Sequence, residues 1–312
     1  MKKAGIIGGS GFIGSHITKQ FLDNGFEVKV STRDLSNLDK YQHLSQLKNA
    51  NNLSFSELDV EDKNRLEHFV KDCDIVIHSG TPFQLDVEDP KRDLFDPTIK
   101  GTENFLEAIH NSPKVKKVVI IASVAAWNTN FPLPAGNKSA SDEFSKNDTP
   151  FTSEESHPYA QAKFIANQTV NDFIKKYPNL DTEIVSVSPV MVMGKSLSNR
   201  EDSTSTGIQF LFKNKIVPNP FIQMFYDEDV TMAIVNVNDV AISVYKAATI
   251  LGLHGKNYLL SSETYPVSDV TLMLNNQSPK HAAKIIYQNQ LAERQLGVPF
   301  QSVQSTLKEY NS

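Results

Sequence analysis

The sequence of 312 residues contains one cysteine, Cys73, which excludes an intramolecular disulfide and any cysteine-rich metal centre. Its eight histidines are scattered without the spacing of a zinc site, so we expect no metal ion. No apolar run approaches the roughly 18 residues that would suggest a membrane span. The start, MKKAGIIGG, is too short and too rich in glycine for a signal peptide. We therefore expect a cytoplasmic protein in which Cys73 only packs.

An excess of positive charge is also missing. Lys and Arg number 31 against 36 Asp and Glu, giving a formal net charge of −5, and no basic tract occurs. A general nucleic-acid binder needs clustered cations, so we expect no nucleic-acid partner. Hydrophobic residues make up 39% and charged residues 21% of the chain. This composition is typical of a globular protein with a full core and excludes wholesale disorder.

The first half of the chain alternates short apolar runs with amphipathic stretches, a pattern that predicts βαβ units in a Rossmann-type, doubly wound parallel sheet of the α/β class. The expected strands are Ala4–Gly8, Glu27–Thr32, Leu53–Glu57, Ile75–His78, Lys117–Ala122 and Glu183–Val187. The expected helices are Phe12–Asn24, Lys63–Lys71, Pro97–Asn111 and Tyr159–Tyr177.

Beyond Pro189 the alternation stops, which predicts a smaller lobe. We assign residues 1–188 to a dinucleotide-binding core, to which residues 234–250 return. Residues 189–233 and 251–312 are assigned to a substrate-binding lobe. Within the core, Asp96 before Pro97 is typical of an N-cap followed by proline at the first helical position.

A glycine-rich turn follows the first expected strand and opens a helix. Glycines at positions 8, 11 and 14 allow a tight turn and a close approach of backbone to pyrophosphate, and the helix start offers free N–H groups. A glycine pattern alone also occurs in ordinary turns, but the strand–turn–helix setting favours dinucleotide binding. The residues expected to line this phosphate site are Gly8, Ser10, Gly11, Phe12, Ile13 and Gly14.

The end of the second strand distinguishes between nicotinamide cofactors. A site that prefers NAD(H) places an acidic residue there to accept the ribose hydroxyl. This chain has Thr32 there, followed by Arg33, with Lys40 seven residues later. Two cations suit a 2′-phosphate, so we expect NADP(H) rather than NAD(H), although both side chains could also be ordinary surface charges.

The end of the third strand carries Asp59 and Val60. A carboxylate and a backbone group at this position could meet the adenine edge of the cofactor. Asp59 could instead cap the helix that starts near Lys63, a role open equally to Asp62. The sequence does not decide between these two interpretations.

Tyr159 and Lys163 are four residues apart, which places both on one face of a helix. A free phenol has a pKa near 10, and a neighbouring ammonium is expected to lower it toward the range of acid–base catalysis. Ser123 ends the apolar strand KKVVIIAS, at the edge of an open α/β sheet where ligands bind. Its hydroxyl could contact a reacting oxygen or merely cap a loop. Together these residues predict a catalytic Ser–Tyr–Lys set.

These motifs, with the segments STRDLSNLDKYQHL, DIVIHSGTPF, DPTIKGTENFLEAI, IIASVAAWN, SPVMVMG and NVNDVA, resemble the extended short-chain dehydrogenases/reductases of the NAD-dependent epimerase/dehydratase superfamily. The similarity is greatest to the dihydroflavonol-4-reductase-like branch with its aldehyde, ketone and methylglyoxal reductases. It covers most of residues 1–245 and implies monomers or homodimers.

The resemblance implies that Arg33 and Lys40 hold the 2′-phosphate, that Ser123 polarises the substrate and that Tyr159 donates a proton. Lys163 would tune Tyr159 and bind the nicotinamide ribose. Further cofactor contacts implied are His78, Ser79, Gly80, Thr81, Pro189 and Val190. The residues expected to contact substrate, from the resemblance for Asn128 and from apolar character for the others, are Phe83, Trp127, Asn128 and Met191.

The leading hypothesis is an NADPH-dependent oxidoreductase that transfers hydride to the carbonyl of a small, largely apolar aldehyde or ketone, with Tyr159 as proton donor. One alternative is a sugar-nucleotide epimerase or dehydratase with retained NAD⁺. Such enzymes usually have an acidic residue where Thr32 stands and Val-Tyr-Gly where this chain has Ala126-Trp127-Asn128. A second alternative is a non-enzymatic regulator that senses NADP(H).

Overall fold

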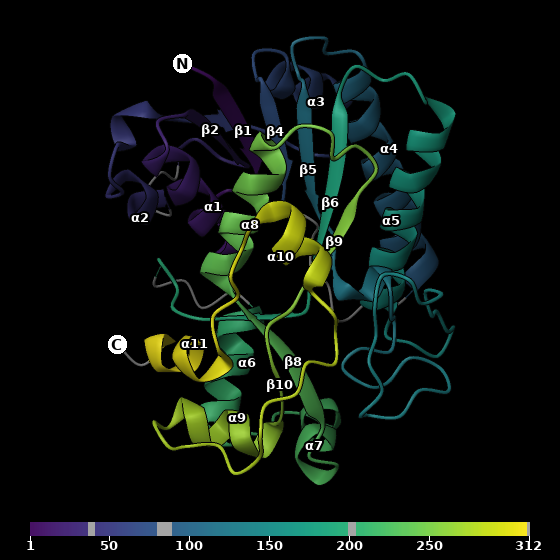
Figure 1. The fold of residues 1–312 in the computed structure, drawn as a ribbon. Coiled ribbons are helices and arrows are strands. Elements are labelled where there is room, and N and C mark those ends of the chain that lie inside the picture. The colour runs from purple at the N-terminus through teal and green to yellow at the C-terminus, as the bar shows by residue number, and fades with distance from the viewer. Residues whose placement is uncertain (37–40, 80–88, 199–203, 311–312) are drawn as a thin grey trace.

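The computed structural model describes residues 1–36, 41–79, 89–198 and 204–310 and has a seven-stranded parallel sheet at its centre (Figure 1). The strand order is β3-β2-β1-β4-β5-β6-β9. The strands are β1 (Lys3–Ile7), β2 (Glu27–Thr32), β3 (Leu53–Glu57), β4 (Ile75–His78), β5 (Lys117–Ile121), β6 (Glu183–Pro189) and β9 (Asn257–Leu260). The apolar runs of these strands are buried, except in the edge strand β3, because helices cover both faces of the sheet.

The two faces of the sheet belong to two separate apolar layers. On one face α1 (Phe12–Asp23) packs against α8 (Val237–Thr249). On the other face α4 (Asp96–His110) packs between α3 (Lys63–Val70) and α5 (Pro158–Lys176). The short helix α2 (Gln42–Ser45) lies beyond α1 (Figure 1). This arrangement confirms the expected Rossmann-type fold.

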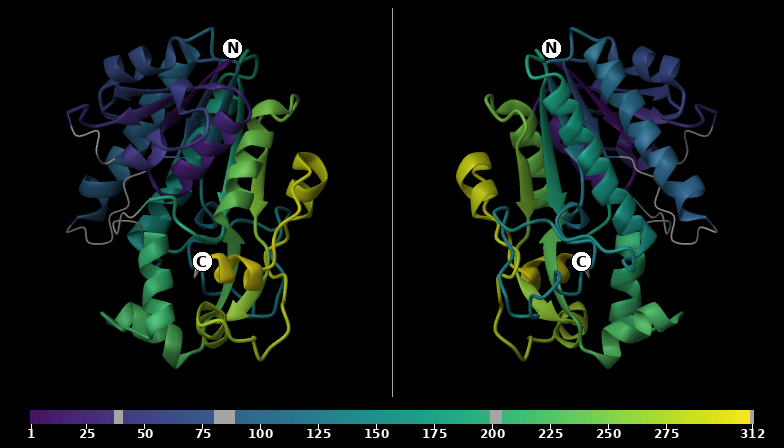
Figure 2. Two further views of the ribbon diagram at one scale, coloured as in Figure 1. Left: turned by 90° about the vertical axis from the view of Figure 1, so that its left-hand side faces the viewer. Right: turned by 90° about the vertical axis from the view of Figure 1, so that its right-hand side faces the viewer.

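A smaller lobe lies below the carboxyl edge of the large sheet (Figures 1 and 2). It is built on a second sheet in the order β10-β8-β7, which encloses an apolar cluster of its own. Its strands are β7 (Met191–Met193), β8 (Thr231–Asn236) and β10 (Thr264–Pro266). Its helices are α6 (Thr204–Asn214), α7 (Pro220–Asp227), α9 (Val267–Leu274) and α11 (Val303–Tyr310).

Two expectations about this division need correction. Strand β9 pairs with β6 in the large sheet, and α10 (Gln290–Leu296) packs against β9, so part of residues 251–312 belongs to the core. Residues 234–236, expected in the core, complete β8 of the small sheet.

Asp96 is not an N-cap, because a π-helical turn, Lys91–Phe95, runs directly into α4. The other expected bounds differ by no more than three residues from those observed.

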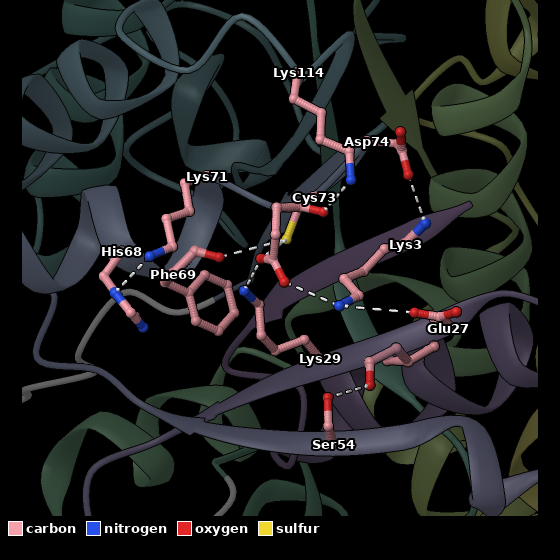
Figure 3. A network of polar contacts seen from close by, with 12 residues as sticks. Lys3, Glu27, Lys29, Ser54, His68, Phe69, Lys71, Cys73, Asp74 and Lys114 are labelled. Carbon is pink, nitrogen blue, oxygen red and sulfur yellow. Dashed lines mark hydrogen bonds and ion pairs between the residues drawn. The ribbon is translucent and has the colours of Figure 1, made fainter. Parts of the chain in front are cut away.

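A polar network joins the amino ends of the strands, far from the carboxyl edge (Figure 3). The buried Lys29 donates a hydrogen bond to the Asp72 carboxylate and lies 4.9 Å from the centre of the Phe69 ring. Lys3 Nζ donates to the same carboxylate at 2.9 Å. Next to it, burial raises the pKa of Cys73 to about 11, so the thiol is not activated and only packs, as expected.

None of the helices in the described part of the chain has both the length and the apolar character needed to cross a membrane.

Candidate functional site

The glycine turn after β1 closes on itself at the carboxyl edge of the sheet. Gly8 has φ +78°, and Gly11 N donates to Gly8 O at 3.1 Å. A Cβ at position 14 would lie 2.0 Å from Gly8 O, so the close packing of α1 on this turn requires glycine there. Gly11 is the N-cap of α1 and contributes no capping side chain. The first-turn N–H groups of α1 therefore remain available for an anion.

Neighbouring strands hold this turn in place. Gly8 N donates to Ser31 Oγ on β2 at 2.9 Å. Ser79, directly after β4, donates its hydroxyl to Ile7 O at 2.8 Å, so its side chain braces the end of β1. Within the expected phosphate site, Phe12 is buried while Ser10 and Ile13 are half-buried. Gly80, Thr81, Phe83 and Lys40 lie outside the described residues.

Thr32 ends β2 as expected, but its hydroxyl is engaged within the protein. Thr32 Oγ1 lies 2.6 Å from Tyr41 Oη, and it also contacts Asp34 N at 3.1 Å and Asp34 O at 3.0 Å. The expected contact between this hydroxyl and the cofactor is therefore not favoured. Arg33, the next residue, is exposed at the same edge.

The choice between Asp59 and Asp62 is resolved in part. Asp62 caps α3, since its Oδ1 accepts from Asn64 N at 2.9 Å and Arg65 N at 3.1 Å. Asp59 is exposed beyond β3, and its carboxylate accepts a local hydrogen bond from Glu61 N at 3.0 Å. Asp59 is thus not the cap, and an adenine contact by its carboxylate stays a prediction, as does one by the half-buried Val60.

Tyr159 and Lys163 lie in the first turns of α5 and face one another. Lys163 Nζ is 5.5 Å from the centre of the Tyr159 ring. Burial lowers the pKa of Lys163 to about 8 and raises the pKa of Tyr159 above its usual value. The expected lowering of the tyrosine pKa is therefore wrong for the protein without cofactor, because loss of solvent outweighs the nearby cation. A raised pKa keeps the phenol protonated at neutral pH.

Ser123 follows β5 at the same edge and begins a short 3₁₀ turn, Val124–Ala126. Its Oγ accepts a hydrogen bond from Ala125 N at 3.2 Å, so the capping interpretation is correct. Accepting this bond uses a lone pair and leaves the hydroxyl proton as a donor. The cap therefore orients the hydroxyl without excluding a contact with substrate.

A buried hydrogen bond links the loop after Ser123 to the start of α5. Thr129 Oγ1 and Ser156 Oγ lie 2.8 Å apart, and both residues are buried. Gln161 Nε2 donates to Ser156 O at 2.7 Å. The N-cap of α5 is His157, whose Nδ1 accepts from Tyr159 N at 3.2 Å. No sequence motif indicated these contacts, because they join segments that only the fold brings together.

Two features of this edge fit a nicotinamide dinucleotide. The start of α1 packs directly on the glycine turn, because position 14 has no Cβ to separate them, and this brings the first-turn N–H groups to the turn. The buried Lys163 ammonium makes no hydrogen bond to any other described residue. A buried cation without an acceptor is costly, and ribose hydroxyls would supply acceptors. The glycine turn could hold phosphates and Lys163 a ribose.

The remaining expected cofactor residues lie on β4 and β6. The His78 ring packs against Phe105 of α4, with ring centres 4.6 Å apart, so it is directed toward the helical layer. Burial and the charge of Lys163 lower the pKa of His78 to about 4, which keeps the ring neutral. Pro189 ends β6, and the buried Val190 donates its N–H to Leu260 O. Only their position at the edge supports cofactor contacts.

The expected substrate residues separate into two groups. Trp127 and Met191 are half-buried, and the indole N–H of Trp127 has no hydrogen-bond partner in the described part of the chain. Asn128, in contrast, is fully buried, and its amide donates to Leu133 O and to Tyr287 Oη, both at 2.9 Å. Its proposed contact with substrate is therefore not supported, because both amide protons are used inside the protein.

The sequence profile of the NAD dependent epimerase/dehydratase family matches residues 4–260. An anthocyanidin reductase of Arabidopsis thaliana is 31% identical over 214 residues, which are 67% of this chain and 62% of that protein. The chain thus spans less than two thirds of that relative.

Another relative, cinnamoyl-CoA reductase CAD2 of Medicago truncatula, is 30% identical over 254 residues, 80% of this chain and 74% of that protein. Among solved structures, Gre2 from Candida albicans in complex with NADPH superimposes with a TM-score of 0.83. It is 22% identical, and the superposition covers 100% of this chain and 98% of that one. This structural likeness supports the fold.

Proposed function

The chain belongs to the NAD dependent epimerase/dehydratase family, and from this premise we propose that it is an NADPH-dependent reductase of small, largely apolar aldehydes and ketones. One observation carries the proposal: a half-buried, protonated phenol and a buried ammonium that makes no hydrogen bond to another described residue lie together at the start of α5. That pairing suits a proton donor beside a ribose-binding cation.

Each residue of the set has a separate task in this proposal. Tyr159 donates its phenolic proton to the carbonyl oxygen as that oxygen gains negative charge, and solvent later restores the proton. Ser123 donates a hydrogen bond to the same oxygen, held in place by its contact with Ala125 N. Lys163 places a positive charge next to the phenolate that forms. NADPH, when bound, supplies the hydride that the carbonyl carbon accepts.

The preference for NADPH rests on the end of β2. The last residue of this strand is Thr32 and not an acidic residue, and the exposed Arg33 guanidinium that follows can bind a phosphate through two hydrogen bonds. The Gre2 relative was crystallised with NADPH. An epimerase that retains NAD⁺ is disfavoured by the same absence of an acidic residue.

The experiment is a panel of aldehydes, diketones, 2-oxo compounds and flavonoids, followed by NADPH and NADH consumption. We expect turnover with NADPH on small apolar carbonyls. Tyr159→Phe should bind NADPH normally and lose roughly 100-fold or more of the turnover. Tyr258→Phe is the matched control, because its hydroxyl donates to Gln295 on α10 and should not matter for catalysis.

Near-normal turnover by Tyr159→Phe would overturn the assignment of the proton donor. Stoichiometric NAD⁺ that survives dialysis, with no reduction of any carbonyl, would favour the epimerase alternative. Tight NADP(H) binding without turnover on the whole panel would favour a cofactor-sensing regulator.

A further inference from the structure

The hydroxyl of Thr32 is saturated with hydrogen bonds. A threonine hydroxyl has one proton to donate and two lone pairs that can accept. Asp34 N donates to one lone pair at 3.1 Å, and the proton can go to Asp34 O at 3.0 Å. With the Thr32 proton on Asp34 O, the phenol of Tyr41, 2.6 Å away, occupies the remaining lone pair by donating its own proton. Nothing on Thr32 Oγ1 is then left for a ligand.

Tyr41 is itself held rigidly in this position. It is 8% exposed, and its ring lies 5.2 Å from the ring of Phe55 on the neighbouring strand β3. The adjacent Ser31 accepts from Gly8 N, so the end of β2 borders the glycine turn directly. The Tyr41–Thr32 contact therefore lies at the edge where the adenosine half of a dinucleotide would be distinguished.

We propose that Tyr41 is a specificity-determining residue that acts against NADH by occupying the lone pair with which Thr32 would accept a ribose 2′-hydroxyl. This inference rests on the proposed function, because it places a nicotinamide dinucleotide at this edge. NADH offers a hydroxyl that finds no acceptor on Thr32. NADPH has a phosphate at the same position and needs a donor or a cation instead, so the saturated hydroxyl does not affect it.

The test compares the dissociation constants of NADPH and NADH, measured by the fluorescence of the reduced nicotinamide, so it does not depend on turnover. Tyr41→Phe keeps the ring against Phe55 and removes only the hydroxyl. We expect it to bind NADH about 3- to 10-fold more tightly, the range that one hydrogen bond supports, with little gain for NADPH. Tyr258→Phe, which also loses one buried tyrosine hydrogen bond, should leave both constants unchanged.

A second variant tests the role of Thr32 itself. Thr32→Val removes the hydroxyl without changing the shape of the side chain. It should leave the NADH and NADPH constants within twofold of the original, because the saturated hydroxyl contacts neither cofactor. In the Tyr41→Phe background, Thr32→Val should abolish the gain in NADH affinity.

An unchanged or increased preference for NADPH in Tyr41→Phe would overturn the inference and leave the proposed function intact. Weaker NADH binding by Thr32→Val alone would overturn it too, because the hydroxyl would then contact the ribose. If the unsubstituted protein bound neither dinucleotide, the proposed function would fail, and this inference with it.

Discussion

The ammonium of Lys163 lies 5.5 Å from the centre of the Tyr159 ring, and both side chains have lost most of their contact with water. Burial shifts the two pKa values in opposite directions, because it favours the neutral form of each group. The phenol therefore stays protonated, and the pKa of the ammonium falls to about 8. In the protein without cofactor, the positive charge of Lys163 is therefore destabilised by burial.

Replacement of Lys163 by methionine should stabilise the cofactor-free protein while abolishing turnover. The pKa of Lys163 is about 8 in the folded chain and 10.5 in its ordinary state. The free-energy cost of burying the charged ammonium is therefore fully present below pH 8. Between pH 8 and pH 10.5, Lys163 is deprotonated in the folded state but still protonated in the unfolded state, so the cost decreases as the pH rises. We expect a gain on the order of 1–3 kcal/mol at pH 7 in urea unfolding.

The gain should shrink when the same measurement is made at pH 9.5. Lys116→Met removes an exposed lysine and should change the free energy of unfolding by no more than about 0.5 kcal/mol. A Lys163→Met protein that is less stable at both pH values would show that the ammonium is stabilised even without cofactor.

Gly14→Ala should weaken both folding and cofactor binding. The added Cβ would lie 2.0 Å from Gly8 O and 2.8 Å from Gly9 Cα, so either the turn or α1 must move. We expect the NADPH dissociation constant to rise at least about tenfold, since the first-turn N–H groups would no longer face the turn together. Gly101→Ala in α4 is the control, because no atom of the described residues lies within 4 Å of its Cβ. Equal binding by the two variants would contradict the prediction.

The sequence predicted the large sheet well because its strands are continuous apolar runs followed by helices of regular spacing. Strand β9 was missed, since it is only four residues long and joins β6 across a long separation that contains the strands and helices of the smaller lobe. Parallel strands end at one edge, so the positions of Gly14, Ser123 and Tyr159 followed from the strand–helix order. Their roles in binding and catalysis stay predictions.

What failed was the direction of individual side chains. Asn128 stands in a segment expected to meet substrate, yet the fold brings Tyr287 to its amide. Thr32 occupies the expected position, but Tyr41 uses its hydroxyl. Tyr287 is distant in sequence from Asn128. Tyr41 lies within the same segment as Thr32, but no spacing rule for that segment predicts that its phenol meets the Thr32 hydroxyl.

Asp72→Asn should destabilise the protein at neutral pH and not in acid. Burial alone would raise the pKa of Asp72, but hydrogen bonds from Lys29 and Lys3 hold it well below its usual range (Figure 3). Its contribution to stability is therefore present above about pH 4 and is lost as the pH falls toward the lower folded value. Because this carboxylate is 41% exposed, solvent screening limits the expected loss to about 1–2 kcal/mol.

The comparison variant for this network is Lys29→Met. Asp72→Asn leaves the buried Lys29 ammonium without a carboxylate, whereas Lys29→Met removes the buried charge and leaves Asp72 paired with Lys3. We expect Lys29→Met to cost less in urea unfolding at pH 7. A larger cost for Lys29→Met than for Asp72→Asn would show that packing against Phe69, not charge, holds this edge together.

Loss of the Thr129–Ser156 hydrogen bond should slow turnover without weakening substrate binding. This bond joins the loop that carries Ser123 to the turn before Tyr159, so it helps to set the distance between the two groups. Thr129→Val and Ser156→Ala should each lower kcat by roughly 3- to 10-fold, because small errors in alignment are costly in catalysis. We expect the KM for the carbonyl and the NADPH dissociation constant to stay within twofold.

The two residues act as one contact only if their effects do not add. The double variant should be about as slow as the worse single variant, and Thr129→Ser, which keeps the hydroxyl, should restore kcat. Thr169→Val is the matched control, since that hydroxyl donates to Ile165 O within α5. If the losses in kcat of the two single variants add, or if Thr169→Val lowers kcat as well, the prediction is contradicted. The slower reaction would then come from general loosening of the helix and not from a changed distance to Ser123.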